Sequence, residues 1–230
     1  MNRPTRLVVQ ALVAALLAIP VMVTTASAAD PTTVSITKDR SYYVAGQSAQ
    51  LTVVTSGTGS GKALRVTVSY ANGATKTVSS GATDDTFTFE FGMYINSTIR
   101  ADVLDGDTVV ATDEVTMPVR AKLGTRAFGY HQKYGSYLLY PRGSSPSFRS
   151  ATGPAVPGNR CLRHVVQRRY ASGWKTVFTS ACRVEDSKGR VDWSWRGKHA
   201  SGVRFRVRAT FAGDSLNRAN AGNLIYFRFR

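Results

Sequence analysis

Cysteine and histidine are scarce in this 230-residue sequence, which has two cysteines and three histidines. The histidines, His131, His164 and His199, stand far apart, and neither Cys-x-x-Cys nor His-x-x-x-His spacing occurs. A zinc site needs three or four such ligands at characteristic spacings, so we expect no metal site. No Gly-x-Ser-x-Gly stretch seats a serine nucleophile, and a triad would also need a positioned histidine and acid. We therefore expect no enzyme activity and no cofactor.

Acidic residues are scarce in one part of the chain only. Residues 120–230 contain 22 Lys and Arg but four Asp and Glu, whereas residues 30–119 contain six basic and ten acidic residues. Four carboxylates leave little material for the acid pair of a glycosidase. Seventeen of the 22 basic residues are Arg, the better bidentate partner for phosphate and carboxylate. This part should gather anions, which fits either contact with a polyanion or a solvated basic surface.

Long hydrophobic runs are absent after residue 29. The one apolar run, at 7–23, follows Arg3 and Arg6 and precedes the small residues Ala26-Ser27-Ala28. This order is typical of a cleavable secretory signal. The run is shorter than the ~20 apolar residues of a spanning helix, and no cysteine follows it to carry a lipid. We predict a signal peptide at 1–29, a secreted or cell-envelope-associated protein and no transmembrane segment.

The two cysteines, Cys161 and Cys182, both follow the predicted signal. A matched pair in an oxidising compartment is most simply a disulfide. The segments on either side of Ala171-Ser172 resemble the arms of a hairpin, in which Tyr170 would oppose Gly173 and Cys161 would directly oppose Cys182 in a non-hydrogen-bonded pair. Closing this loop should stabilise the fold by about 3 kcal/mol.

Alternating apolar residues predict short β-strands throughout residues 30–119, with no stretch of helical periodicity. Asn72-Gly73 and Asp105-Gly106 fall between such runs and favour type I′ hairpin turns. About seven strands in fewer than 90 residues are typical of an immunoglobulin-like sandwich. The expected strands contain Val34–Ile36, Ala49–Val53, Leu64–Tyr70, Thr75–Val78, Phe87–Phe91, Ile99–Val103 and Val109–Val115.

The alternating apolar residues of 120–230 predict a second β-sandwich, which begins where the net charge of the chain changes sign at Arg120. Residues 123–158 are rich in Gly, Ser and Pro and should form two or three short strands. After the disulfide hairpin, strands are expected around Val191–Trp195, Val203–Phe211 and Ile225–Phe229. The fold class is thus all-β, with two tandem immunoglobulin-like β-sandwiches at 30–119 and 120–230 after the signal peptide.

Both halves resemble the bacterial immunoglobulin-like domains of exported actinobacterial proteins. In the first half, the resemblance rests on Tyr43-Val44-Ala45-Gly46-Gln47-Ser48-Ala49-Gln50-Leu51-Thr52-Val53. In the second half, it rests on Val166-Gln167-Arg168, Gly173-Trp174-Lys175-Thr176-Val177, Ser187-Lys188-Gly189-Arg190 and Phe205-Arg206-Val207-Arg208-Ala209. The resemblance implies a secreted or surface accessory role and supplies no catalytic residues, because a fold does not imply a function.

Arginine alternates with apolar residues on the last two expected strands, which predicts a basic outer face if the strands share one sheet. This candidate polyanion-binding stripe comprises Arg204, Arg206, Arg208, Arg228 and Arg230. No known nucleic-acid motif accompanies it, so sequence-specific reading of nucleic acid is not expected.

Two further groups of residues invite a functional interpretation. Trp174, Trp193 and Trp195 could form a sugar-binding platform, but we favour core packing, since Trp193 and Trp195 share parity with Val191. Asp102, Asp105 and Asp107 suggest calcium, yet the EF-hand spacing and its later Glu are missing. A hairpin turn explains Asp105 and Gly106 by itself.

Three functional hypotheses follow from the sequence. The first is a non-enzymatic interaction protein whose basic second domain contacts an anionic envelope polymer or polysaccharide. The second is a carbohydrate-binding module that uses the aromatic residues of the same domain. The third is an enzyme with an unrecognised site. Salt separates the first two, because it weakens ionic contacts but not the stacking of neutral sugars.

Overall fold

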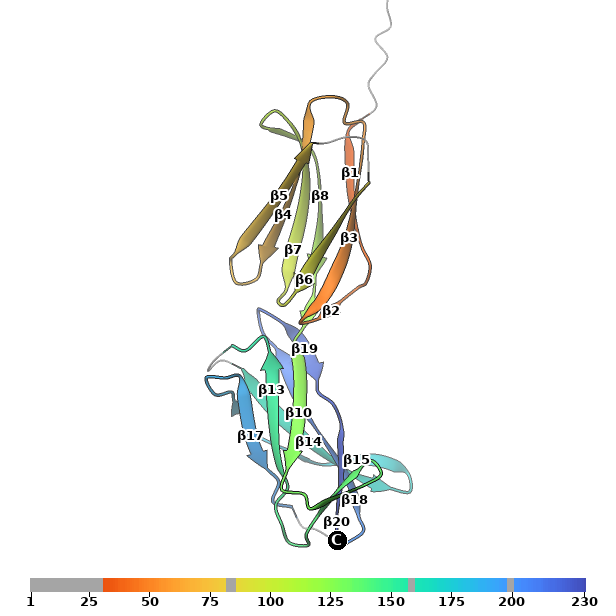
Figure 1. The fold of residues 1–230 in the computed structure, drawn as a ribbon, viewed down its shortest axis with the longest axis vertical. Coiled ribbons are helices and arrows are strands. Elements are labelled where there is room, and N and C mark those ends of the chain that lie inside the picture. The colour runs from red at the N-terminus through yellow and green to blue at the C-terminus, as the bar shows by residue number, and fades with distance from the viewer. Residues whose placement is uncertain (1–30, 82–85, 157–159, 198–200) are drawn as a thin grey trace, which may run out of the picture. The chain divides into compact units, whose positions relative to one another are not determined.

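The computed structural model describes residues 31–81, 86–156, 160–197 and 201–230 (Figure 1). These residues form β-strands and connecting turns, with no helix among them. None of the described residues therefore forms a helix that could span a membrane. The predicted signal peptide lies outside the described residues. The chain is an all-β protein of sandwich type, as the alternating sequence pattern predicted.

The first sandwich packs two antiparallel sheets around one core. One sheet has the order β1-β3-β6, and the other β5-β4-β7-β8. Inward residues of both sheets, such as Leu51, Val66 and Ile99, are almost fully buried. The strands are β1 (Thr33–Lys38), β3 (Gln47–Ser56), β4 (Lys62–Tyr70), β5 (Thr75–Gly81), β6 (Thr86–Met93), β7 (Ser97–Asp105) and β8 (Thr108–Met117).

The two predicted hairpin turns of the first sandwich are present, but neither is of type I′. No described residue other than glycine has a positive φ, whereas type I′ needs two such residues. The Gly73 amide donates to the Tyr70 carbonyl, and Gly73 has a φ of 87°. This geometry matches a three-residue loop ending in a left-handed glycine. In the β7–β8 turn only Gly106 has a positive φ, as in a type II′ turn.

Residues near the predicted domain boundary pair with strands from both halves of the chain. β9 (Val119–Arg120) pairs in parallel with β2 (Tyr43–Val44) and with β19 (Arg218–Ala221). Pro31–Arg230 form one compact unit, yet buried clusters on the two sides of residue 120 are separate. The division into domains at 119/120 stays a prediction.

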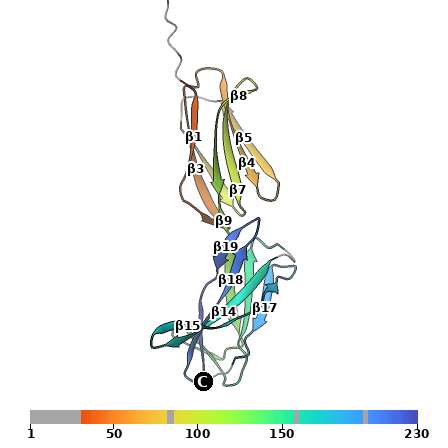
Figure 2. The ribbon, with the colours of Figure 1, turned by 180° about the vertical axis from the view of Figure 1, so that it is seen from behind.

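The second sandwich also has two sheets, which Figure 2 shows from behind. The smaller sheet has the order β10-β13-β17. In the larger sheet, β18 pairs with β14, β19 and β20, while β12 adds to β20 in parallel. The strands are β10 (Lys122–Phe128), β11 (Gln132–Tyr134), β12 (Tyr137–Tyr140), β13 (Ser147–Gly153), β14 (Cys161–Tyr170), β15 (Gly173–Thr179), β16 (Arg183–Val184), β17 (Arg190–Ser194), β18 (Arg204–Gly213) and β20 (Ile225–Phe229).

The core of the second sandwich has a larger cluster rich in aromatic residues and a smaller cluster that is mostly aliphatic. Trp193, Trp195, Phe205 and Phe227 belong to the larger cluster, so the predicted core packing of two tryptophans is confirmed. The smaller cluster includes Leu162 and Ala209. Residues 123–158 contain four strands rather than the predicted two or three.

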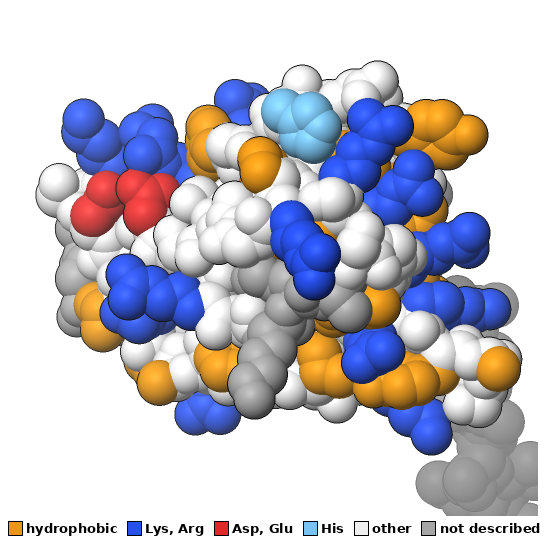
Figure 3. Space-filling model, turned by 90° about the horizontal axis from the view of Figure 1, so that it is seen from below, with side chains coloured by type: hydrophobic (Ala, Val, Ile, Leu, Met, Phe, Trp, Pro, Cys, Tyr) orange, Lys and Arg blue, Asp and Glu red, His pale blue; other side chains and the backbone are white. Residues whose placement is uncertain are grey.

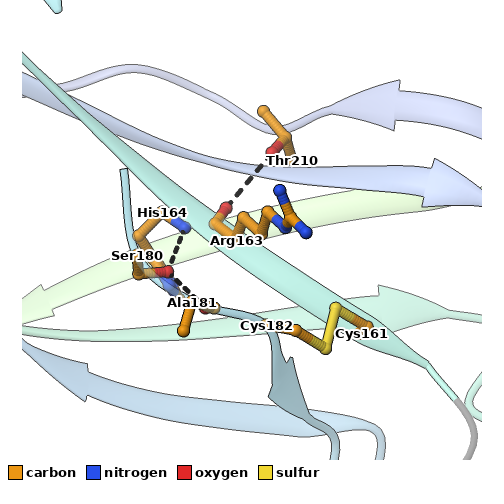
Figure 4. The surroundings of a disulfide bond; sticks show 7 residues. All are labelled: Cys161, Arg163, His164, Ser180, Ala181, Cys182 and Thr210. Carbon is orange, nitrogen blue, oxygen red and sulfur yellow. Dashed lines mark hydrogen bonds between the residues drawn. A yellow bond between two sulfur atoms is a disulfide. The ribbon is translucent and has the colours of Figure 1, made fainter. Parts of the chain in front are cut away.

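The predicted disulfide joins Cys161 and Cys182, whose Cα atoms are 5.4 Å apart (Figure 4). The turn is as predicted, since Tyr170 opposes Gly173. The predicted direct opposition of the cysteines is wrong. Val177 of β15 is an extra residue, left without a partner where the register shifts between Val166 and Gln167 of β14. The register shifts by one more residue before β16, so Cys161 pairs with Val184 instead. The cross-link survives because Cys182 lies just before β16, still within reach of β14.

Candidate polyanion-binding surface

The structure brings the five predicted arginines to the outer face of one sheet. β18 and β20 are antiparallel neighbours, and Arg204 lies directly opposite Arg228. Arg206 and Arg208 follow on the same side of β18, while Phe205 and Val207 point into the core. Arg230 directly follows β20 and donates to the side-chain oxygen of Gln132 at 3.3 Å.

Aromatic rings lie between these arginines. The Arg228 guanidinium carbon is 4.9 Å from the Tyr134 ring centroid, and that of Arg204 is 5.8 Å from Tyr137. Arg206 lies 4.6 Å from the Trp174 centroid. The rings also meet each other edge to face, since Tyr226 contacts both Tyr137 and Trp174.

We call this surface the arginine–aromatic face. Its members come from six strands or strand ends, β11, β12, β14, β15, β18 and β20. They are Tyr134, Tyr137, Arg169, Trp174, Arg204, Arg206, Arg208, Tyr226, Arg228 and Arg230.

Sequence reasoning placed the arginines but missed their aromatic partners. The prediction that Trp174 packs into the core is wrong: Trp174 is half-buried on the outer face, because the β14 residue opposite it is the outward Arg169. Tyr134 and Tyr137 belong to the segment that had no clear strand pattern. The sequence does show several tyrosines at 130–140, but only the structure shows that β12 (Tyr137–Tyr140) pairs with β20.

No Asp or Glu side chain of residues 120–230 lies on the arginine–aromatic face. All four are used elsewhere in the described structure: Glu185 is buried against Thr152, and the Asp186 side chain accepts hydrogen bonds from turn amides. Asp192 pairs with Arg149 and Asp214 with Arg160. Consequently, none of the five predicted arginines makes an ion pair with a described residue. Figure 3, which views the molecule from below, shows many Lys and Arg side chains spread over that view and acidic side chains in one place only.

This arrangement suits the capture of oxyanions by guanidinium groups. A guanidinium stacked on a ring keeps its N–H edges free to donate, and it is easier to desolvate than an ammonium group. The Arg206 Nε–H is directed by Gln167, which accepts it at 2.7 Å. Like charges directly opposite on neighbouring strands, such as Arg204 and Arg228, destabilise a sheet, and a bound polyanion would relieve that repulsion.

A serine and a histidine meet inside the second sandwich, but their setting does not suit catalysis. Ser150 Oγ lies 2.9 Å from His164 Nε2 and 2.9 Å from Thr125 Oγ1, and all three residues are buried. Nδ1 of His164 has no hydrogen-bond partner among the described residues, so no acid orients the ring. These side chains form a polar layer within the core.

The described aspartates of the first sandwich do not converge on a cation. Asp102 is buried and accepts hydrogen bonds from Arg65, Arg100 and Thr112, while Asp105 and Asp107 are exposed at the β7–β8 hairpin. No group of three potential metal ligands forms among the residues that the structure describes.

Comparison with known proteins gives no family. No protein-family model matches the sequence, and no curated protein matches it either. Among solved structures, a tetra-tandem repeat from the extending region of a large adhesion protein is 13% identical, with a TM-score of 0.42 over 85% of this chain. A DUF4785 family protein from Legionella pneumophila is 10% identical, with a TM-score of 0.36 over 82% of this chain. A Salmonella α2-macroglobulin is 12% identical, with a TM-score of 0.34 over 87% of this chain. This chain covers 47% of the adhesion-protein chain, 54% of the DUF4785 chain and 15% of the macroglobulin chain.

Proposed function

We propose that the mature protein is an exported, non-enzymatic interaction protein that holds anionic polymers of the cell envelope on its arginine–aromatic face. The observation that carries this proposal is the segregation of charge in the second sandwich. Five arginines and their stacked rings share one face, and all four carboxylates of residues 120–230 lie elsewhere.

Export is part of the proposal. It is supported by the signal-like segment at 1–29 and by the disulfide, a bond that persists in oxidising compartments. The finer assignment to bacterial immunoglobulin-like domains of exported actinobacterial proteins rests on the sequence patterns quoted above and fits the two sandwiches. In such a protein, the first sandwich would serve as a spacer or as a contact for another partner.

A neutral sugar is a second candidate ligand, because Tyr134 is 63% exposed and Trp174 lies half-buried on the same outer face. The geometry favours an anionic ligand over this candidate. A guanidinium lies beside each of these rings, so a ligand that reaches the rings also meets cations, which favour an anionic group.

Retention on isolated cell envelopes tests the proposal. The mature protein, a face variant and a control variant are applied to envelopes across a salt series, with soluble anionic or neutral polysaccharide as competitor. The face variant is Arg204→Gln/Arg206→Gln/Arg208→Gln. The control removes the same charge from exposed arginines elsewhere, as Arg142→Gln/Arg183→Gln/Arg218→Gln.

We expect retention that falls steeply with salt, yields to the anionic competitor and is lost in the face variant only. Retention that is insensitive to salt and yields to neutral polysaccharide would favour the carbohydrate-binding module. Equal loss in both variants would mean that net charge, rather than this face, holds the protein.

A further inference from the structure

The outer face of the smaller sheet of the second sandwich contains a hollow of about 620 Å³ over β10 and β13. It lies on a different sheet from the arginine–aromatic face. Gly124 of β10 directly opposes Ala151 of β13, and both point outward, since their neighbours Thr125 and Ser150 are buried. Two such small residues side by side leave a depression in the sheet surface.

The depression is open rather than filled by a neighbouring side chain. A Cβ added to Gly124 would meet no atom within 4 Å, and the backbone there has no positive φ. Asn223 fixes the adjoining edge of β10, since its side chain accepts from the Thr125 amide at 2.8 Å and donates to the Thr125 carbonyl at 3.1 Å. The backbone of Thr125, at the edge of the hollow, is thus already hydrogen-bonded within the protein.

Three arginines surround the floor. Arg126 and Arg149 are cross-strand neighbours, and Arg190 pairs with Ala151 from the other side. One carboxylate pairs with one of these arginines: Arg149 donates Nε–H and Nη2–H to Asp192 at 2.7 and 2.8 Å. The hydrogen bond from Arg149 lowers the pKa of Asp192, and the charge of Arg190 lowers it further. Arg126 and Arg190 make no ion pair with any described residue, so the hollow keeps two uncompensated cations.

An exposed aromatic ring completes the rim. Phe128 is 45% exposed at the end of β10, and the Arg149 guanidinium lies 5.5 Å from its ring centroid. A flat apolar surface beside a shallow floor suits a ring of similar width. Guanidinium groups at the margin suit a carboxylate or phosphate, which they bind through paired N–H donors.

We propose that this hollow binds one sugar unit bearing a single carboxylate or phosphate. The sugar ring lies over Gly124 and Ala151 against Phe128, and its anionic group contacts Arg126 and Arg190. The site goes beyond the proposed function, because it recognises one unit of a polymer rather than charge alone, and it uses none of the residues of the arginine–aromatic face.

The test is an NMR titration of the mature protein with three probes. These are an oligosaccharide of alternating hexuronate and N-acetylhexosamine, a hexose phosphate, and a neutral oligosaccharide of equal length. Backbone amides of Gly124, Arg126, Ala151 and Arg190 report on the hollow, and those of Arg204 and Arg206 report on the other sheet. The two anionic probes distinguish a carboxylate from a phosphate as the preferred group.

Three variants and one control sharpen the test. Gly124→Val fills the hollow without changing charge, and it should weaken binding at the hollow about tenfold, as should Arg126→Gln/Arg190→Gln. Asp192→Asn removes the competing carboxylate and should strengthen binding about threefold. The face variant Arg204→Gln/Arg206→Gln/Arg208→Gln should bind the probes at the hollow as the wild type does.

The amide spectrum of each variant also shows that it is folded. The site is supported if an anionic probe shifts the four reporter amides and Gly124→Val raises the probe concentration needed for those shifts about tenfold. The proposal is overturned if Gly124→Val binds like the wild type, or if the neutral oligosaccharide binds equally well. Shifts confined to Arg204 and Arg206 would also overturn it while leaving the function of the arginine–aromatic face intact.

Discussion

Protonation of His164 should destabilise the protein between pH 6.5 and pH 4. His164 is fully buried, its ring stacks on Trp193 with the centroids 4.7 Å apart, and Ser150 Oγ lies 2.9 Å from Nε2. Burial, reinforced by the charge of Arg183, lowers the pKa of His164 from 6.5 to about 4. A proton on Nδ1 would have no acceptor among the described residues.

The sign and size of the effect follow from linkage. Because the pKa is lower in the folded state, the unfolded chain binds the proton more readily, and stability rises with pH. The contribution of His164 is fully present above pH 6.5 and is lost as the pH falls towards 4. Integration between these two pKa values gives a loss of about 2 kcal/mol at pH 5 and about 3 kcal/mol at pH 4.

Urea unfolding of wild type and His164→Gln at pH 7.5 and pH 5 measures this directly. The variant should be less stable than wild type at pH 7.5. Because glutamine does not titrate, only the wild type loses stability on acidification, so the difference in unfolding free energy between the two proteins should narrow by about 2 kcal/mol at pH 5. Other titrating groups, including Glu185, whose pKa burial raises, are shared by both proteins and cancel in the difference. The control is His131→Gln, at an exposed histidine, and its difference in unfolding free energy from wild type should be the same at both pH values. A difference of equal size for His164→Gln at both pH values would refute the reasoning, as would an NMR titration of His164 with a midpoint near 6.5.

Three further predictions concern stability and can be checked by chemical unfolding. Asn217→Ala should lower the free energy of unfolding by about 3 kcal/mol or more, because it leaves the buried Arg160 without one acceptor and the Tyr94 and Val119 carbonyls without a donor. The control Asn220→Ala removes one half-buried hydrogen bond and should lower it by about 1 kcal/mol. Equal losses for the two variants would contradict this prediction. Cys161→Ala/Cys182→Ala should lower the free energy of unfolding by about 3 kcal/mol through the 21-residue loop that it opens, and no difference from the reduced wild type is expected. Arg228→Gln should raise stability by about 0.2–1 kcal/mol at low salt by removing the cation opposite Arg204, and a gain that persisted in 1 M salt would not be electrostatic.

The pattern of alternate residues predicted the faces of individual strands well. Arginines at every second position of β18 and β20 predicted that these side chains would share an outer face, and the strand pairing places them there. Local periodicity reports which way each side chain points, because successive residues of a strand alternate between faces. The same reasoning correctly buried Trp193 and Trp195.

Features that depend on pairing between distant strands could not be predicted. The extra residue Val177 in β15 shifted the register opposite β14 and so changed the expected partner of Cys161, and a single inserted residue leaves no mark in the alternation of the opposite strand. Tyr137 reaches Tyr226 only because β12 adds to β20 in parallel across almost 90 residues of chain. The hollow over Gly124 likewise arises from its register with Ala151, which neither residue shows alone.

The dependence of affinity on salt tests the proposed polyanion contact most directly. The binding constant for a linear polyphosphate is measured over a series of salt concentrations for wild type, for Arg204→Gln/Arg206→Gln/Arg208→Gln and for Arg142→Gln/Arg183→Gln/Arg218→Gln. Release of about 0.7 counterion per contact predicts that the slope of log K against log salt falls by about 2 when three contacts are lost. We expect that fall in the face variant and a much smaller change in the control. Equal slopes for the two variants would show that the arginine–aromatic face is only a solvated basic surface.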